Sequence, residues 1–179
     1  MRSVLSIVLA LCLSSCAGQP PKKDHQLIER RASKSSYNSC FSSDEACDEK
    51  LIHFIRSAKK SLDIAIFHLT HPEIVHEILV VFRRVPVRII VDRKQAKQDF
   101  SLVDSLVKAG VEVRMGRQRG IMHHKFVIVD GEFLETGSFN FTLGAAFKNQ
   151  ENQVYLTDPE IVERFKDHFE KMWNDSFRI

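Results

Sequence analysis

From residue 43 to residue 179, short apolar runs with the two-residue period of a strand alternate with stretches whose apolar residues follow a helical period. The strand-like runs are 61–69, 87–91, 111–115, 122–129, 132–136 and 153–156. The helical stretches are 43–60, a segment that begins at 70–72, 99–109, and the segment that follows Asp158. Helical crossovers separate the first strands and hairpin-like connections join the middle ones, which predicts an α/β fold.

The N-terminus has the layout of a secretory signal peptide. A positive start precedes an apolar run at 4–13, which is shorter than the roughly 20 residues that a transmembrane helix needs. Residues 13–17, LSSCA, resemble a bacterial lipobox. This resemblance implies a signal peptide over 1–15, a lipid on Cys16, and an exported protein anchored at the outer membrane or the periplasmic face. The alternative is an ordinary signal peptide that is cut at Ser15 or Gly18.

Residues 16–34 carry the lipidated cysteine and a basic tether, with five basic and two acidic residues. A net charge of +3 suits a solvated linker, and would also suit contact with anionic headgroups or nucleic acid. Cys40 and Cys47 follow as an even pair. In an oxidising compartment they form either a disulfide or two separate thiols, and the sequence leaves both outcomes open. No second pair of soft ligands accompanies them, which disfavours a zinc site.

The segment GIMHHKFVIVDGEFLETGSFN carries the side chains with chemical function. Alternate residues of a strand share a face, so His123 and Lys125 point one way and His124 points the other. An unpaired cation in an apolar strand is costly, and the pair is explained if an anion such as a phosphate binds there. Lys125 would neutralise an oxygen while His123 attacks phosphorus or moves a proton. Ser138 and Asn140 would donate hydrogen bonds to the same oxygens.

These residues resemble the signature of the phospholipase D superfamily, which is His-x-Lys-x4-Asp followed by Gly-Ser-x-Asn, with Asp130 as the aspartate. The resemblance runs from about Tyr37 to the C-terminus. Within that superfamily, the chain resembles small bacterial nucleases of the Nuc type, including membrane-attached NucT-like ones. The resemblance implies a phospholipase D-like sandwich over 35–179, with a mixed central sheet flanked by helices and one domain per chain.

The resemblance also implies roles for single residues. His123 is the nucleophile that forms a covalent phosphohistidine, and the phosphate is bound by Lys125, Ser138 and Asn140. Asp130 is grouped with the catalytic residues and stabilises the site architecture, although an ordinary turn residue would also fit there. Glu151 stands where a downstream acid orients the histidine. The reaction uses no metal and no other cofactor.

A superfamily site uses two motif histidines, one to attack and one to protonate the leaving oxygen. This chain has one copy of the motif, because the segment HFEK at 168–171 has the wrong spacing and lies on a predicted helix. We therefore expect a homodimer with one composite site on its two-fold axis.

The distribution of charge favours a polyanionic substrate. Residues 83–125 hold eleven basic residues against four acidic ones, although 35–179 as a whole holds 20 against 21. Arg114, Arg117 and Arg119 precede the motif and are expected to form a nucleic-acid track. The predicted function is an endonuclease for DNA, with single strands preferred and RNA as a further substrate, that serves DNA uptake or nucleotide scavenging. The alternatives are a phospholipase D or cardiolipin hydrolase, and a surface receptor that binds DNA without cleaving it.

Overall fold

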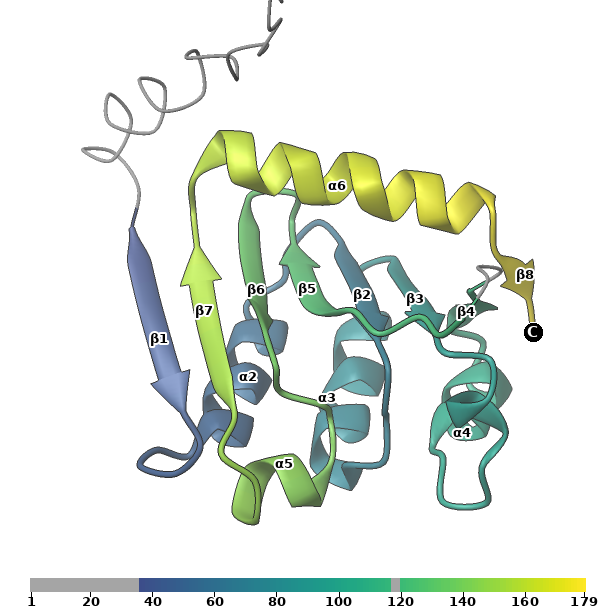
Figure 1. The fold of residues 1–179 in the computed structure, drawn as a ribbon. Helices are drawn as coiled ribbons and strands as arrows, with labels where there is room; N and C mark the ends of the chain where they lie inside the picture. The colour runs from purple at the N-terminus through teal and green to yellow at the C-terminus, as the bar shows by residue number, and fades with distance from the viewer. Residues whose placement is uncertain (1–35, 117–119) are drawn as a thin grey trace, which may run out of the picture. The chain divides into compact units, whose positions relative to one another are not determined.

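The computed structural model describes residues 36–116 and 120–179 (Figure 1). The elements are β1 (Tyr37–Phe41), α2 (Cys47–Arg56), β2 (Leu62–Ile66), α3 (Pro72–Phe82), β3 (Val87–Val91), η1 (Gln95–Lys97), α4 (Val103–Lys108), β4 (Glu112–Met115), β5 (Lys125–Val129), β6 (Phe133–Gly137), α5 (Leu143–Phe147), β7 (Asn152–Leu156), α6 (Pro159–Asn174) and β8 (Phe177–Arg178). Cys16 and the predicted signal peptide lie outside the described residues. Within the described residues, no helix has both the length and the apolar character that crossing a bilayer requires.

The strands form one eight-stranded sheet in the order β1-β7-β6-β5-β2-β3-β4-β8. β2, β3 and β4 run parallel because α3 and α4 cross over between them. The other neighbouring pairs are antiparallel. The predicted α/β class, with one domain and a mixed central sheet flanked by helices, is confirmed.

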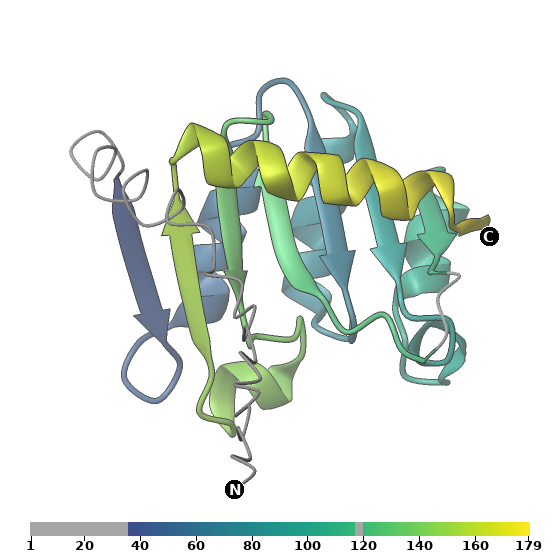
Figure 2. The ribbon, with the colours of Figure 1, turned by 45° about the horizontal axis from the view of Figure 1, so that its top comes forward.

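Helices cover both faces of the sheet, and the two-residue period of the strands decides which residues each helix contacts (Figure 2). Val127 and Val129 of β5 belong to the core cluster that includes α2 and α3. Phe126 and Ile128 belong to the cluster that includes α6. The alternation predicted for this strand is therefore correct, and α6 packs on the face opposite to α2 and α3.

Some boundaries differ from the sequence prediction. β5 begins at Lys125 rather than at residue 122, because the Met122 N–H is bonded to the Asp92 carboxylate and not to a neighbouring strand. α4 begins at Val103 rather than at 99, since a 3₁₀ turn and a short loop follow β3. On α6, Ile161 is 36% exposed and lies off the buried face. The residues that α6 buries are Val162, Phe169, Met172 and Trp173.

Cys40 and Cys47 are joined by a disulfide, with their Cα atoms 5.7 Å apart. This is the first of the two outcomes that the sequence leaves open. The bond closes the loop between β1 and α2, and both cysteines are fully buried. The loop is thereby tied to the core at both of its ends.

Candidate active site

Four of the motif residues, His123, Lys125, Ser138 and Asn140, come from the end of the sheet where the parallel strands β2 and β3 finish and β5 begins. β5 is antiparallel to β2 and pairs Lys125 with Ile66, so β5 begins where β2 ends. β6 finishes and β7 starts at the same end, with Gly137 opposite Gln153. The segment before β5 therefore lies beside the segment that follows β6. Ligands of open α/β sheets bind at this end, outside the carboxyl ends of the parallel strands.

Lys125 is a buried cation without a carboxylate partner among the described residues. Its residue is 7% exposed, and its Nζ donates a hydrogen bond of 2.7 Å to the His123 carbonyl oxygen. The same Nζ lies 5.2 Å from the centre of the Phe67 ring. Burial lowers the pKa of Lys125 below its ordinary value, and the negative charge of Glu151 offsets part of this shift. An ammonium group held this way is stabilised when an anion binds beside it.

His123 is exposed and lies two residues before β5 begins. Its ring contacts that of Phe67, with the two ring centroids 4.6 Å apart. Desolvation lowers the pKa of His123 below its usual 6.5, and the positive charges of Lys125 and His68 lower it further. A histidine with a lowered pKa is neutral near pH 7 and keeps a ring lone pair. His123 therefore has the protonation state that a nucleophile needs.

Ser138 and Asn140 are held in place by neighbouring loops. The Ser138 Oγ accepts a 3.1 Å hydrogen bond from the Asn152 N–H, and the Asn140 Oδ1 accepts one of 3.3 Å from the His68 N–H. A Cβ at Gly137 would lie 2.0 Å from the Asn152 carbonyl oxygen. Only glycine allows β6 to pass this close to β7, which explains the glycine of the Gly-Ser pair.

Glu151 reaches the site through the serine and not through the histidine. Its carboxylate accepts a hydrogen bond from the Ser138 Oγ. Its backbone is bound twice to Ser42, whose N–H donates to the Glu151 carbonyl at 3.0 Å and whose Oγ accepts from the Glu151 N–H at 2.9 Å. Ser42 belongs to the loop that the disulfide closes. Within the described residues of one chain no hydrogen bond joins Glu151 to His123, so its predicted orienting role is not seen here.

Asp92 is a site residue that the sequence reasoning missed. It is 3% exposed, and its Oδ2 accepts a 3.0 Å hydrogen bond from the N–H of Met122, the residue before His123. Its Oδ1 accepts from the N–H groups of Lys94 and Gln95 at 2.9 and 3.0 Å. Asp92 thus ties the loop after β3 to the segment that carries the histidine. An aspartate directly after a strand was the available signal, because such residues bond backbone N–H groups two or three positions on.

Asp130 lies at the opposite end of β5 from His123. Its backbone has a φ of 58°, a left-handed conformation that aspartate tolerates. Its carboxylate accepts hydrogen bonds from the N–H groups of Lys59, Lys60 and Ser61, at 2.6 to 3.1 Å. Burial alone would raise its pKa, but these bonds hold the pKa below 3.8. Asp130 therefore fixes the start of β2 to the β5–β6 turn and has a structural role in this chain.

Replacing Asp130 by alanine should lower the free energy of unfolding by about 2 to 3 kcal/mol, because three backbone N–H groups lose their acceptor. The folded-state pKa is depressed, so this stabilisation is present above pH 3.8 and is lost as the pH falls through the lowered pKa. Urea unfolding at pH 7 and at acid pH measures both effects. Asp99→Ala, at an exposed loop position, is the matched control. Equal stability of the two variants at pH 7 would contradict the assignment.

His124 points to the face opposite His123, as predicted. Its Nε2 lies 3.2 Å from the Nε2 of His168 on α6, and the two ring centroids are 5.0 Å apart. Burial lowers the pKa of His124, and the positive charge of His168 lowers it further. The described residues contain no group of three or more His, Cys, Asp or Glu side chains that is arranged to hold a metal ion.

The predicted nucleic-acid track is described only at Arg114. Its guanidinium lies 4.1 Å from the centre of the Trp173 ring and donates hydrogen bonds to the Trp173 carbonyl and to Glu112, at 2.9 and 3.0 Å. These contacts make Arg114 a link between β4 and the end of α6, which does not fit a place in an open track. Arg117 and Arg119 lie outside the described residues.

Comparisons with known proteins agree on the family. Residues 51–173 match the family described as "Cardiolipin synthase, PLD-like domain". A mitochondrial cardiolipin hydrolase of Chlamydomonas reinhardtii is 38% identical over 126 residues, which cover 70% of this chain and 56% of that protein. A phospholipase D of Rickettsia bellii is 32% identical over 147 residues, or 82% of this chain and 73% of that protein. The crystal structure of Nuc from Salmonella typhimurium, a phospholipase D family member, superposes with a TM-score of 0.77 at 29% identity, covering 82% of this chain and 99% of that one.

The chain spans little more than half the length of the cardiolipin hydrolases that it matches. The matched family region nevertheless includes the whole motif, from His123 to Asn140. The fold also covers almost all of Nuc. With His123, Lys125, Ser138 and Asn140 at one end of a mixed, helix-flanked sheet, the chain belongs to the phospholipase D superfamily.

Proposed function

We propose that this chain is a metal-independent endonuclease that cleaves DNA, with single strands preferred over duplexes and RNA as a further substrate. The observation that carries the proposal is the buried ammonium of Lys125, which lacks an ion-pair partner among the described residues and lies next to a histidine with a lowered pKa. DNA uptake and nucleotide scavenging are the roles that such an exported enzyme would serve.

The proposed reaction has two displacements at phosphorus. A ring nitrogen of His123 attacks, a phosphorus–nitrogen bond forms, and the bond from phosphorus to the leaving oxygen breaks as a second histidine donates a proton to that oxygen. Water then attacks the phosphohistidine and returns the free imidazole. Lys125, Ser138 and Asn140 stabilise the charge that develops on the oxygens of the phosphate.

The second histidine is proposed to come from a second copy of the chain. Exposed apolar side chains lie two residues before His123 and in the helix α5 that follows Asn140: Ile121 is 50%, Leu143 is 49% and Phe147 is 71% exposed. Such side chains suit coverage by a partner subunit. Sedimentation should show a dimer, and a mixed dimer with one His123→Ala subunit should lose most of its activity. A chain that sediments as a monomer while fully active would exclude the composite site.

A lipid phosphodiester is the second candidate substrate. A cardiolipin hydrolase is 38% identical to the chain, and a phospholipase D is 32% identical. Phe100, 61% exposed in the loop after η1, and Phe147 would suit contact with acyl chains.

We also propose that the protein is exported and anchored through Cys16. Incorporation of labelled fatty acid that is lost in Cys16→Ser would test the anchor.

One assay separates the candidate functions. The chain from residue 17 onward is incubated in EDTA with single-stranded DNA, duplex DNA, RNA or cardiolipin vesicles, beside the His123→Ala variant. DNA cleavage that resists EDTA and is lost in the variant is the expected result. Release of phosphatidic acid from vesicles without DNA cleavage would replace the nuclease by the lipase. DNA binding without cleavage by either form would indicate a receptor.

A further inference from the structure

The helix α6 carries two stripes of opposite charge that run side by side. Residues four and three positions apart share a face of a helix. One stripe, the acidic stripe, is Glu163, Asp167 and Glu170, and the other, the basic stripe, is Arg164, His168 and Lys171. All six side chains are exposed. The helix therefore separates an acidic side from a basic side.

The acidic stripe is already partnered within the chain. Glu163 pairs with Lys166 at 2.8 Å, and Glu170 pairs with Arg88 at 2.6 Å. This stripe borders a hollow of about 650 Å³ that Asp130 also lines, at the end of the sheet remote from His123. By contrast, no ion pair or hydrogen bond engages the side chain of Arg164 or Lys171 within the described residues. The basic stripe is thus the side of α6 with free positive charge.

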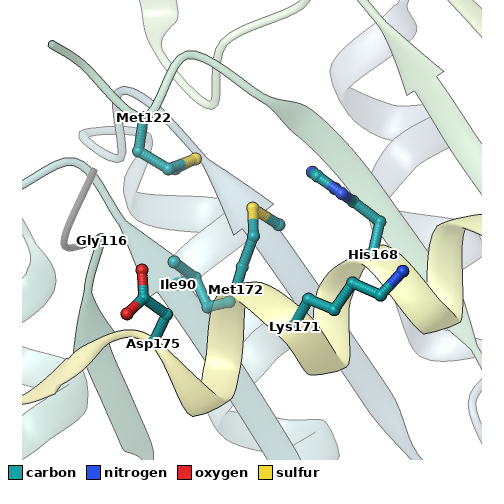
Figure 3. Close-up of a pocket in the computed structure, with 7 residues that line it drawn as sticks. All are labelled: Ile90, Gly116, Met122, His168, Lys171, Met172 and Asp175. Atoms are coloured by element: carbon teal, nitrogen blue, oxygen red, sulfur yellow. The ribbon is translucent and has the colours of Figure 1, made fainter. Parts of the chain in front are cut away.

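The basic stripe borders two hollows beside the catalytic segment. Arg164 and His168 line a hollow of about 460 Å³ together with His124. His168 and Lys171 line another of about 310 Å³ together with Met122, where both side chains leave α6 next to Met172 (Figure 3). Met122 and His124 are the chain neighbours of the proposed nucleophile on either side. Both hollows therefore open next to the place where a scissile phosphate would lie.

Apolar side chains form part of the lining of both hollows, and the smaller one is also lined by Asp175. Phe126 and Phe165 lie in the larger one, and Ile90 and Met172 lie in the smaller one. Seven residues of α-helix separate the two ends of the stripe, a distance of about 10 Å. Positive charge at two points above apolar surface matches a strand whose phosphates and unstacked bases are both accessible. A duplex keeps its bases paired and stacked, so it would use the charge alone.

We propose that the basic stripe and these two hollows form a groove that holds a single nucleic-acid strand beside the scissile phosphodiester. The inference rests on the proposed nuclease function and specifies its substrate track. The stripe takes the place of the track expected at Arg114, whose guanidinium is bound to Trp173. Neighbouring nucleotides contact α6 on one face of the sheet while the reacting phosphate contacts Lys125 at the sheet end.

The test measures binding without cleavage. The full chain carrying His123→Ala is titrated with a fluorescent single strand of about 16 nucleotides at salt concentrations of about 50 to 300 mM. Adding Arg164→Ala and Lys171→Ala should weaken the affinity about tenfold and lower the slope of log K against log salt by about 1.4, which is about 0.7 for each phosphate that the protein no longer neutralises. For a dinucleotide the loss of affinity should be much smaller, because its one bridging phosphate cannot contact both Arg164 and Lys171.

Lys166→Ala is the matched control, since it removes a positive charge of the same helix that is paired with Glu163 of the acidic stripe. Its affinity and salt slope should stay within about twofold of the parent's. An equal effect of both changes would overturn the groove and leave only a general effect of net charge. DNA cleavage by the wild-type chain with no effect of the double change on affinity or slope would overturn the groove alone.

Two further outcomes separate this inference from the proposed function. DNA binding that depends on the stripe, in a wild-type chain that cleaves no DNA, would support the groove and end the nuclease proposal. Binding to vesicles that contain cardiolipin, lost in the double variant and without any DNA binding by the parent, would overturn the groove in favour of a lipid surface. Thermal unfolding of each variant confirms that the exposed substitutions leave the fold intact.

Discussion

Replacing His123 by alanine is expected to lower kcat for phosphodiester hydrolysis by at least about 10³-fold, because the reaction loses the atom that attacks phosphorus. The loss should be equal for single-stranded DNA and for a small chromogenic phosphodiester, since both need the same first displacement. The covalent step has its own readout. Wild-type protein that is mixed with labelled DNA and denatured in alkali should retain label, and acid should release it, because the nitrogen–phosphorus bond of phosphohistidine is acid-labile.

The matched control is His76→Ala, an exposed histidine on α3. It should keep the wild-type kcat and the alkali-stable label. A His123→Ala protein that retains about a tenth of the wild-type kcat would show that another group attacks phosphorus.

The pH profile of the wild-type chain gives a second check on the same residue. Attack needs the neutral imidazole, so activity should fall as the pH drops through the pKa of His123. Burial and the charges of Lys125 and His68 hold that pKa below 6.5, so the acid limb should lie below pH 6.5. A limb at or above this value would contradict the electrostatics of the site.

Local periodicity and capping predicted much of the fold. β3 forms at the predicted residues Val87–Val91, and α3 and α6 begin at the predicted places, with Pro72 and Pro159 as their first residues. β1 was missed because four of its five residues are exposed and its sequence has no strand period. It is a strand because it pairs with β7, which lies more than a hundred residues later in the chain. A single sequence carries no signal for such a pairing.

For the site, too, the local sequence predicts some features and leaves out those that depend on distant contacts. His123, Lys125, Ser138 and Asn140 lie within one short motif, and the hairpin of β5 and β6 brings them to one end of the sheet. The contacts that hold them are distant in sequence and depend on how the loops pack. Asp92 bonds the N–H of a residue 30 positions away, which no local pattern reveals. The sequence also groups Arg114 with the other basic residues near the motif as one nucleic-acid track, although its guanidinium is bound to Trp173.

Replacing Lys125 by methionine is expected to lower activity about 10²- to 10³-fold, because the phosphate loses the cation that balances its developing charge. The same change should raise the free energy of unfolding by about 1 kcal/mol, since an ammonium that is buried without a carboxylate partner in the described part of the chain gives way to an apolar side chain of similar length. The hydrogen bond that the ammonium donates to the His123 carbonyl is too weak to reverse this sign. Activity and stability should therefore move in opposite directions.

The gain in stability has a defined pH dependence. Burial puts the pKa of Lys125 in the folded protein below 10.5, its value in the unfolded chain, so folding is opposed by the charged form. The penalty is full below the lowered pKa and disappears above 10.5, and the advantage of Lys125→Met should follow it. Urea unfolding at pH 7 and pH 10.5 measures this, with Lys94→Met, at an exposed position, as the control. A Lys125→Met protein that is both inactive and less stable would show that the ammonium is compensated inside the fold. In that case binding of a phosphate would not be what stabilises its charge.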